Sequence, residues 1–133
     1  MYIGIDVRDT KMGIGIVDDK GVLSFDNIFP IDPELGVDKL MLDIIYIAKN
    51  ISETVPLELF NDRITGIGIC TKNTLEKNIS MQLIIQQYFD VPVFVESQEA
   101  AMVLVENEIG TLKGNIINNE GVIVAGLLCK AKA

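Results

Sequence analysis

The chain has 133 residues, enough for one domain with a buried core, and we expect a single domain over residues 1–133. Nearly half of the residues are hydrophobic, which excludes a disordered chain, and the net charge of −8 makes nucleic acid an unfavourable partner. Histidine is absent, which excludes imidazole general bases, Ser-His or Cys-His nucleophile pairs and histidine metal ligands.

The first part of the chain predicts three strands in an antiparallel meander. Two apolar runs, Tyr2–Val7 and Lys11–Val17, are separated by a short turn at residues 8–10. A second turn, "DDKG", leads into a more polar strand over Val22–Ile28. Short turns between consecutive strands favour antiparallel pairing.

A long amphipathic helix is expected next. Asp32 is a suitable cap and Pro33 suits the first turn of a helix. Apolar residues then recur at helical spacing over residues 37–51 and form one stripe. A loop is expected over Ser52–Arg63, where Pro56 interrupts the pattern.

The rest of the chain predicts alternating strands and helices. The glycine-containing run Ile64–Ile69 is a short apolar strand, in which the glycines indicate close packing or a nearby ligand. A helix near Ser80–Phe89, a strand over residues 91–95 and a helix over Gln98–Ile109 follow. The apolar segment 119–131 has the composition of a packed terminal helix, although the same run also fits a strand.

This order of elements predicts an α/β fold. We expect a mixed five-stranded sheet, with three antiparallel strands followed by two α-linked parallel strands, flanked by helices. The arrangement is ribonuclease H-like and is also the core of an actin-like ATPase lobe.

Two further features limit the function. No signal peptide is visible and no apolar run approaches the ~18 residues of a membrane span, so we expect a cytoplasmic protein with no membrane partner. Cys70 and Cys129 lie far apart in apolar segments without an activating basic residue. We therefore expect buried thiols rather than a reactive or metal-binding site.

Four stretches carry a family resemblance. "IDVRDTK", with Asp6 and Thr10, is similar to a motif Asp-x-Gly-Gly-Thr-Lys, and "GIGICT", with Gly66 and Gly68, is similar to a Gly-Ile-Gly strand. "VPVFVESQEAA", with Glu96, resembles Pro-Val-x-Val-Glu-Asn-Asp-Ala, and "EGVIVAGLLCKA" resembles a closing helix. Together they resemble the ROK family of sugar kinases and repressors, which are built from two actin-like lobes.

The resemblance implies that kinase chemistry is lost. Arg8 and Asp9 stand where the family's phosphate loop has two glycines, whose missing side chains let backbone N–H groups reach the anion. Gln98 stands where the family's catalytic Asp takes the sugar proton, and an amide cannot accept and hold that proton. The chain also passes directly from the first lobe to the closing helix, so the second lobe is missing. No catalytic residue is therefore predicted.

The loss of kinase chemistry still allows the chain to bind a ligand or a metal ion. The residues that are candidates for binding a ligand or a metal are Asp6, Thr10, Gly66, Gly68, Glu96 and Gln98. Asp6 ends a central strand, where it can position Mg²⁺ or equally cap its own turn. No cofactor is predicted, and Mg²⁺ at Asp6 is the one candidate ion.

Three functions follow from these features. The first is a non-catalytic binding, regulatory or dimerisation module, acting as a homodimer or with an unknown protein partner, and with a small-molecule ligand as a further option. The second is a resolvase-type, metal-dependent nuclease that uses Asp6 with Glu96 or Glu99. The third is residual nucleotide or sugar binding through Asp6, Thr10 and the "GIG" strand at residues 66–68.

Overall fold

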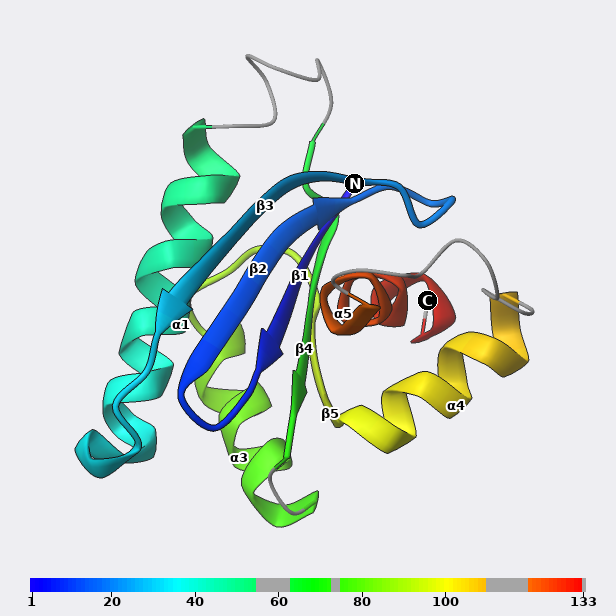
Figure 1. The fold of residues 1–133 in the computed structure, drawn as a ribbon. Coiled ribbons are helices and arrows are strands. Elements are labelled where there is room, and N and C mark those ends of the chain that lie inside the picture. The colour runs from blue at the N-terminus through cyan, green and yellow to red at the C-terminus, as the bar shows by residue number, and fades with distance from the viewer. Residues whose placement is uncertain (55–62, 73–74, 110–119, 133) are drawn as a thin grey trace.

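The computed structural model describes residues 1–54, 63–72, 75–109 and 120–132. It contains a mixed five-stranded sheet with the strand order β3-β2-β1-β4-β5 (Figure 1). The strands are β1 (Tyr2–Val7), β2 (Lys11–Val17), β3 (Leu23–Pro30), β4 (Gly66–Thr71) and β5 (Val93–Ser97). The first three pair antiparallel, and β4 and β5 extend the sheet in parallel, which confirms the predicted fold class.

Helices cover both faces of this sheet. They are the 3₁₀-helix η1 (Pro33–Leu35), α1 (Gly36–Thr54), α3 (Leu75–Gln86), α4 (Gln98–Ile109) and α5 (Glu120–Lys132). In Figure 1, α1 and α3 lie on one face, and α4 and α5 lie on the other. No helix in the described part of the chain is long and apolar enough to cross a membrane.

Most predicted elements are present, with shifted boundaries. β1, β2 and α4 match the expected bounds, and the apolar segment that fitted either a helix or a strand forms the helix α5 over residues 120–132. Asp32 caps η1, as its Oδ1 accepts a hydrogen bond from the Glu34 N–H at 3.0 Å. The long helix runs to Thr54, so the loop predicted from Ser52 begins too early. Pro56 lies outside the described residues.

The helix predicted near Ser80–Phe89 was placed too late. It begins at Leu75, inside a polar stretch that resembles a loop, and ends at Gln86. The Asn78 side chain points inward and its Oδ1 accepts a hydrogen bond of 2.6 Å from the Thr71 hydroxyl. Both residues are buried, so a polar pair inside the fold accounts for the misleading sequence pattern.

The two faces of the sheet have different side chains because strand residues alternate in direction. Isoleucines of β1, β2 and β4 face α1 and α3 and form the larger core, namely Ile3, Ile5, Ile14, Ile16, Ile67 and Ile69. Glycines occupy the intervening positions and face α5. Gly4 pairs with Gly15 on one side and with Gly68 on the other, which makes a row of three glycines across the sheet.

This row allows the backbone of α5 to touch the sheet. A Cβ atom built on Gly4 would lie 2.1 Å from the Val122 carbonyl oxygen, and one on Gly68 would lie 1.7 Å from that of Ala125. Only glycine permits such an approach. The close approach of α5 brings its first turn to the carboxyl end of β1, where the candidate site lies.

Candidate functional site

Asp6 is the central side chain of the site. It lies near the end of β1, is only 7% exposed and faces α5. A Cβ atom on Gly121, in the first turn of α5, would lie 2.1 Å from Asp6 Oδ2. The carboxylate therefore fills the space below the start of that helix, where the positive end of the helix dipole favours an anion.

Arg8 and Gln98 enclose this carboxylate. Arg8 Nε donates to Asp6 Oδ2 at 2.8 Å, and Gln98 Nε2 donates to Asp6 Oδ1 at 3.0 Å. Arg8 Nη1 also donates to Gln98 Oε1 at 3.3 Å, which closes the ring of three side chains. We call Asp6, Arg8 and Gln98 the polar triad. The triad joins β1, its turn and the start of α4 across 90 residues of sequence.

The polar triad does not fit a divalent metal ion. Both oxygens of Asp6 already accept hydrogen bonds, and the Arg8 guanidinium supplies the neutralising positive charge. Mg²⁺ usually requires one or two available carboxylates in addition to waters. Among the described residues, no group of three His, Cys, Asp or Glu side chains could hold a metal ion. Mg²⁺ at Asp6 therefore stays a prediction that the geometry does not favour.

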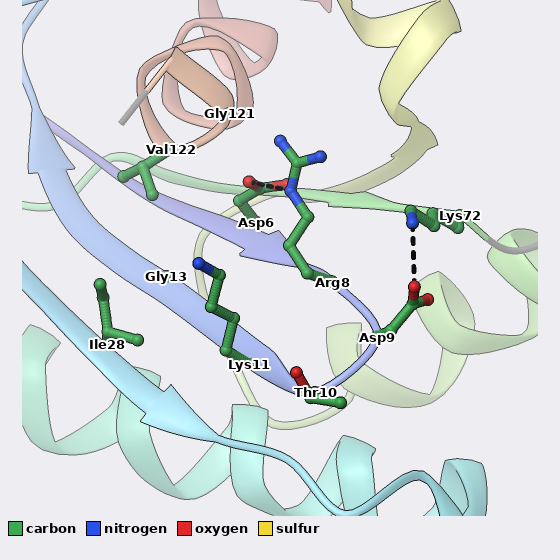
Figure 2. Close-up of a pocket in the computed structure, with 10 residues that line it drawn as sticks. All are labelled: Asp6, Arg8, Asp9, Thr10, Lys11, Gly13, Ile28, Lys72, Gly121 and Val122. Atoms are coloured by element: carbon green, nitrogen blue, oxygen red, sulfur yellow. Dashed lines mark hydrogen bonds and ion pairs between the residues drawn. The ribbon is translucent and has the colours of Figure 1, made fainter. Parts of the chain in front are cut away.

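A pocket of about 500 Å³ opens beside the triad (Figure 2). We call it the turn pocket, because the β1–β2 turn forms one wall. Its lining residues are Asp6, Arg8, Asp9, Thr10, Lys11, Gly13, Ile28, Lys72, Gly121 and Val122. Asp9 forms an exposed ion pair of 3.2 Å with Lys72 at the rim. The Lys11 side chain runs along β2 toward Gly13, so that its ammonium lies in the hollow (Figure 2).

A second, smaller pocket of about 220 Å³ lies between the turn and the start of α1. We call it the helix pocket. Its apolar lining comes from Val7, Ile31, Pro33, Val37 and Leu40. It shares Arg8, Asp9 and Lys72 with the turn pocket, so the two hollows lie on either side of one charged wall.

The structure brings together only part of the predicted site. Asp6 and Gln98 are in contact, and Thr10 lines the same pocket as Asp6. Gly66 and Gly68 instead lie beneath α5, where added Cβ atoms would meet Cys129 and Ala125. Their close packing on a helix was one of the two predicted meanings, and they line neither of the two pockets.

Glu96 has a structural contact at a distance from both pockets. Its carboxylate forms an ion pair with Lys132 near the end of α5. Glu99 is exposed in the first turn of α4. Neither carboxylate lines the turn pocket or approaches Asp6 through a hydrogen bond in the described part of the chain.

Three residues of the site were not identified from the sequence. Arg8 was interpreted as the loss of a glycine and as one option for capping the turn through Asp6, and the structure shows that it pairs with Asp6. Lys72 follows a strand in a polar stretch that gave no signal. Gly121 could have been noticed as a glycine opening an apolar helix, but its contact with Asp6 depends on the fold.

The two thiols are buried as predicted. Burial raises the pKa of Cys70 to about 12, and the nearby Asp6 carboxylate adds to the effect. Burial also raises the pKa of Cys129 to about 12. Thiols with such pKa values are protonated at neutral pH, so neither acts as a nucleophile.

No family model and no curated protein matches this sequence. Solved structures do match its fold. The ROK hexokinase from Thermus thermophilus is 22% identical, with a TM-score of 0.63, over 85% of this chain and 39% of the hexokinase. A ROK family transcriptional regulator, a homolog of the E. coli MLC protein, is 16% identical, with a TM-score of 0.65, over 80% of this chain and 30% of the regulator.

Another solved structure matches over more of its own length. RuvC from T. thermophilus, in complex with a Holliday junction substrate, is 15% identical, with a TM-score of 0.53, over 96% of this chain and 90% of RuvC. At these identities the similarities show the fold, which this chain has in common with actin-like ROK proteins and with ribonuclease H-like RuvC. The chain spans less than half the length of the ROK proteins described above.

Proposed function

We propose that this protein is a non-catalytic ROK-like domain that binds a ligand or a partner and has lost sugar kinase chemistry. The observation that carries the proposal is the polar triad. Gln98 stands where the ROK resemblance places the catalytic base, and its amide is held by Asp6 and Arg8. A neutral amide in this position cannot take a proton from a sugar hydroxyl.

The neighbouring carboxylate cannot replace the missing base. Asp6 is held by two N–H donors, one from Arg8 and one from Gln98. Both carboxylate oxygens are therefore occupied, and the group is aimed at α5 rather than at open solvent. The triad therefore supports a structural role for the residues that the resemblance relates to catalysis.

A kinase assay tests this proposal. We expect the wild-type chain to release no ADP from ATP in the presence of glucose or other hexoses above the level of an Asp6→Asn preparation. The Asp6→Asn control identifies any contaminating kinase, because a contaminant would be unaffected by the substitution. Turnover that requires Asp6 in the wild-type chain would contradict the proposal.

The partner in this proposal docks on helices rather than on the sheet edge at β5. Gln86 Oε1 accepts a hydrogen bond of 2.7 Å from the Val93 N–H, and Gln82 Oε1 accepts one of 2.9 Å from the Val95 N–H. These α3 side chains occupy the outward N–H groups that a second strand would need.

The outer surface of α1 and α3 suits a homodimer or another protein partner. Leu42 and Tyr46 on α1, and Ile79 and Leu83 on α3, are each more than half exposed. Light scattering after size-exclusion chromatography should give a dimer that Tyr46→Asp converts to a monomer. Val103→Asp, at an exposed position of α4, is the matched control. A wild-type monomer at high concentration would contradict self-association.

A metal-dependent nuclease is the second candidate. The similarity to RuvC covers nearly the whole chain, and Asp6 stands at the end of β1. The closed triad, the lack of a carboxylate cluster among the described residues and the net charge of −8 all weigh against it. Cleavage of branched DNA with Mg²⁺ or Mn²⁺, abolished by Asp6→Asn, would favour this candidate instead.

Residual nucleotide or sugar binding is compatible with the non-catalytic proposal. Asp6 and Thr10 share the turn pocket, whose volume lies in the usual range for small-molecule sites. Calorimetric titration with nucleotides and hexoses tests it. If no nucleotide and no hexose gave a heat of binding, residual nucleotide or sugar binding would be excluded.

A further inference from the structure

The charge of the turn pocket is opposite to that of the whole chain. The chain carries a net charge of −8, but the pocket is lined by three cations and two carboxylates, which leaves one positive charge. The cations are Arg8, Lys11 and Lys72, and the carboxylates are Asp6 and Asp9. A positive hollow in an acidic protein attracts anions selectively.

Two of these cations have donors available for a ligand. An arginine side chain has five N–H groups, and Arg8 uses two of them on Asp6 and Gln98. Three N–H groups thus remain, and the guanidinium ends beside Gly121 at the pocket (Figure 2). Lys11 has no hydrogen-bond or ion-pair partner among the described residues, and its ammonium points inward (Figure 2).

The adjoining helix pocket can hold the apolar part of a ligand whose charged group binds in the turn pocket. Its lining from Val37 and Leu40 is apolar and lies across the wall formed by the Asp9–Lys72 ion pair. Both partners of that pair are more than half exposed. Such a pair contributes little stability, so a ligand can displace it.

We infer that the two pockets together form a site for a small monocarboxylate that carries an apolar chain. The carboxylate contacts Arg8 and Lys11 in the turn pocket, and the chain enters the helix pocket against Val37 and Leu40. The guanidinium of Arg8 suits a planar carboxylate, which it can bind through two N–H groups. This inference rests on the proposed binding function and specifies its ligand class.

A phosphate fits the site less well. The glycines that would let backbone N–H groups surround a phosphate are replaced by Arg8 and Asp9. The Asp9 carboxylate at the rim repels a dianion more than a monoanion. The apolar side of the helix pocket also offers no partners to the hydroxyl groups of a sugar; its polar side chains are Asp32 and Thr71, together with Arg8, Asp9 and Lys72 of the shared wall.

Titration of the intact chain by ¹H–¹⁵N NMR tests the site. The probes are acetate, butyrate, hexanoate, inorganic phosphate and the neutral hexanol. We expect the carboxylates to shift the amides of residues 8–11, and hexanoate also to shift those around Val37. Affinity should rise about fourfold for each methylene that enters the helix pocket.

Two variants separate the parts of the site, and both change exposed side chains. Lys11→Gln should weaken every carboxylate about fivefold or more, whereas Val37→Thr should leave acetate unchanged and reduce the gain with chain length. Lys49→Gln is the matched control, because Lys49 lines a different pocket with Phe89. Circular dichroism verifies that each variant is folded.

Three results would overturn the inference. Phosphate that binds as tightly as hexanoate, hexanol that binds equally well, or the absence of amide shifts with every carboxylate would each exclude the site. The kinase assay remains independent of these titrations. If the chain releases ADP and also binds hexanoate, only the non-catalytic function is contradicted. If it releases no ADP and does not bind hexanoate, only the carboxylate site is contradicted.

Discussion

The two faces of the sheet are packed by opposite means. On one face, isoleucine side chains fill the space between the strands and the helices α1 and α3. On the other, glycines remove the side chains so that the α5 backbone lies directly on the strands. Both faces arise from one Ile-Gly alternation in β1, β2 and β4, because successive residues of a strand point in opposite directions.

The difference shows how the candidate site is made. An isoleucine face would hold a helix at the ordinary distance of side-chain packing, too far for α5 to reach Asp6. The glycine row allows Gly121 to meet the carboxylate, and Arg8 and Gln98 complete its surroundings. The stability of the fold therefore depends on side-chain packing on the isoleucine face and on the lack of side chains on the glycine face.

Adding one methyl group to the glycine face should have the largest effect. In Gly68→Ala, the new Cβ would lie 1.7 Å from the Ala125 carbonyl oxygen, and a backbone oxygen cannot rotate away. We expect a loss of roughly 3 kcal/mol or more in the free energy of unfolding, because overpacking against backbone displaces the helix. Urea denaturation followed by circular dichroism measures it.

Gly66→Ala is the control for this prediction. The nearest atom to its new Cβ is the Cys129 sulfur at 3.0 Å, a side-chain atom that can shift. The loss should be clearly smaller than for Gly68→Ala. If the two substitutions lowered the free energy of unfolding equally, the close approach of the α5 backbone to the sheet would not be the reason why this face requires glycine.

Alkaline pH should weaken the glycine face selectively. Cys70 and Cys129 lie on this side, and burial raises the pKa of each to about 12 from 9.0. Between these values the folded chain keeps protons that the unfolded chain has lost, so stability is full below pH 9 and falls as the pH rises toward 12. From pH 8 to pH 10 we expect a loss of about 2–3 kcal/mol for both thiols together.

Urea denaturation at several pH values measures this loss. The variant C70A/C129A should lose much less stability between pH 8 and pH 10, since it lacks both thiols and keeps only Tyr2, whose pKa is raised from 10.0 to about 12 by burial and by its hydrogen bond to Asp19. Its stability at pH 8 gives the separate effect of removing the side chains. A wild-type chain whose stability does not change over this interval would show that the thiols become exposed to solvent without unfolding.

Much of the sheet could be predicted from local pattern. The alternation in "YIGIDV" and "KMGIGIV" places β1 and β2 correctly, since strand periodicity is a property of neighbouring residues. The start of α3 could not be predicted in this way. Its polar first turns look like a loop until Asn78 is seen to bond to buried Thr71, a contact that only the folded chain makes.

The site shows the same limit. Asp6 and Gln98 were singled out by a family resemblance, and their contact spans 92 residues of sequence. Arg8 could be recognised as a departure from a glycine, but its pairing with Asp6 depends on how the turn bends. Gly121 could be noticed only as a glycine that opens an apolar helix, because the atom that it must avoid belongs to a distant strand.

The contact between Gly121 and Asp6 predicts a coupled pair of substitutions. Gly121→Ala should destabilise the chain by about 2 kcal/mol, because its Cβ would lie 2.1 Å from a carboxylate oxygen held by Arg8 and Gln98. In an Asp6→Ala background that oxygen is absent. The same alanine should then be neutral or slightly stabilising, because alanine favours helix over glycine.

A double-mutant cycle of urea denaturation curves measures this coupling. The expected coupling energy exceeds ~1 kcal/mol, since the two positions share one contact. Additive effects would mean that the carboxylate moves freely and that the polar triad does not fix it. Gly36→Ala is not a suitable control, because Gly36 has a φ of 81° that itself favours glycine.

Removing one methyl group from the isoleucine face should have the smallest effect and completes the comparison. Ile69 is fully buried among residues of the larger core, on the strand that also carries Gly68. Ile69→Val should lower the free energy of unfolding by about 1 kcal/mol, through lost apolar contact and a small cavity. Denaturation of Ile69→Val beside Gly68→Ala therefore compares one methyl group removed with one added at adjacent positions. If Ile69→Val lowered the free energy of unfolding more than Gly68→Ala, loss of side-chain packing would destabilise this protein more than overpacking against the α5 backbone.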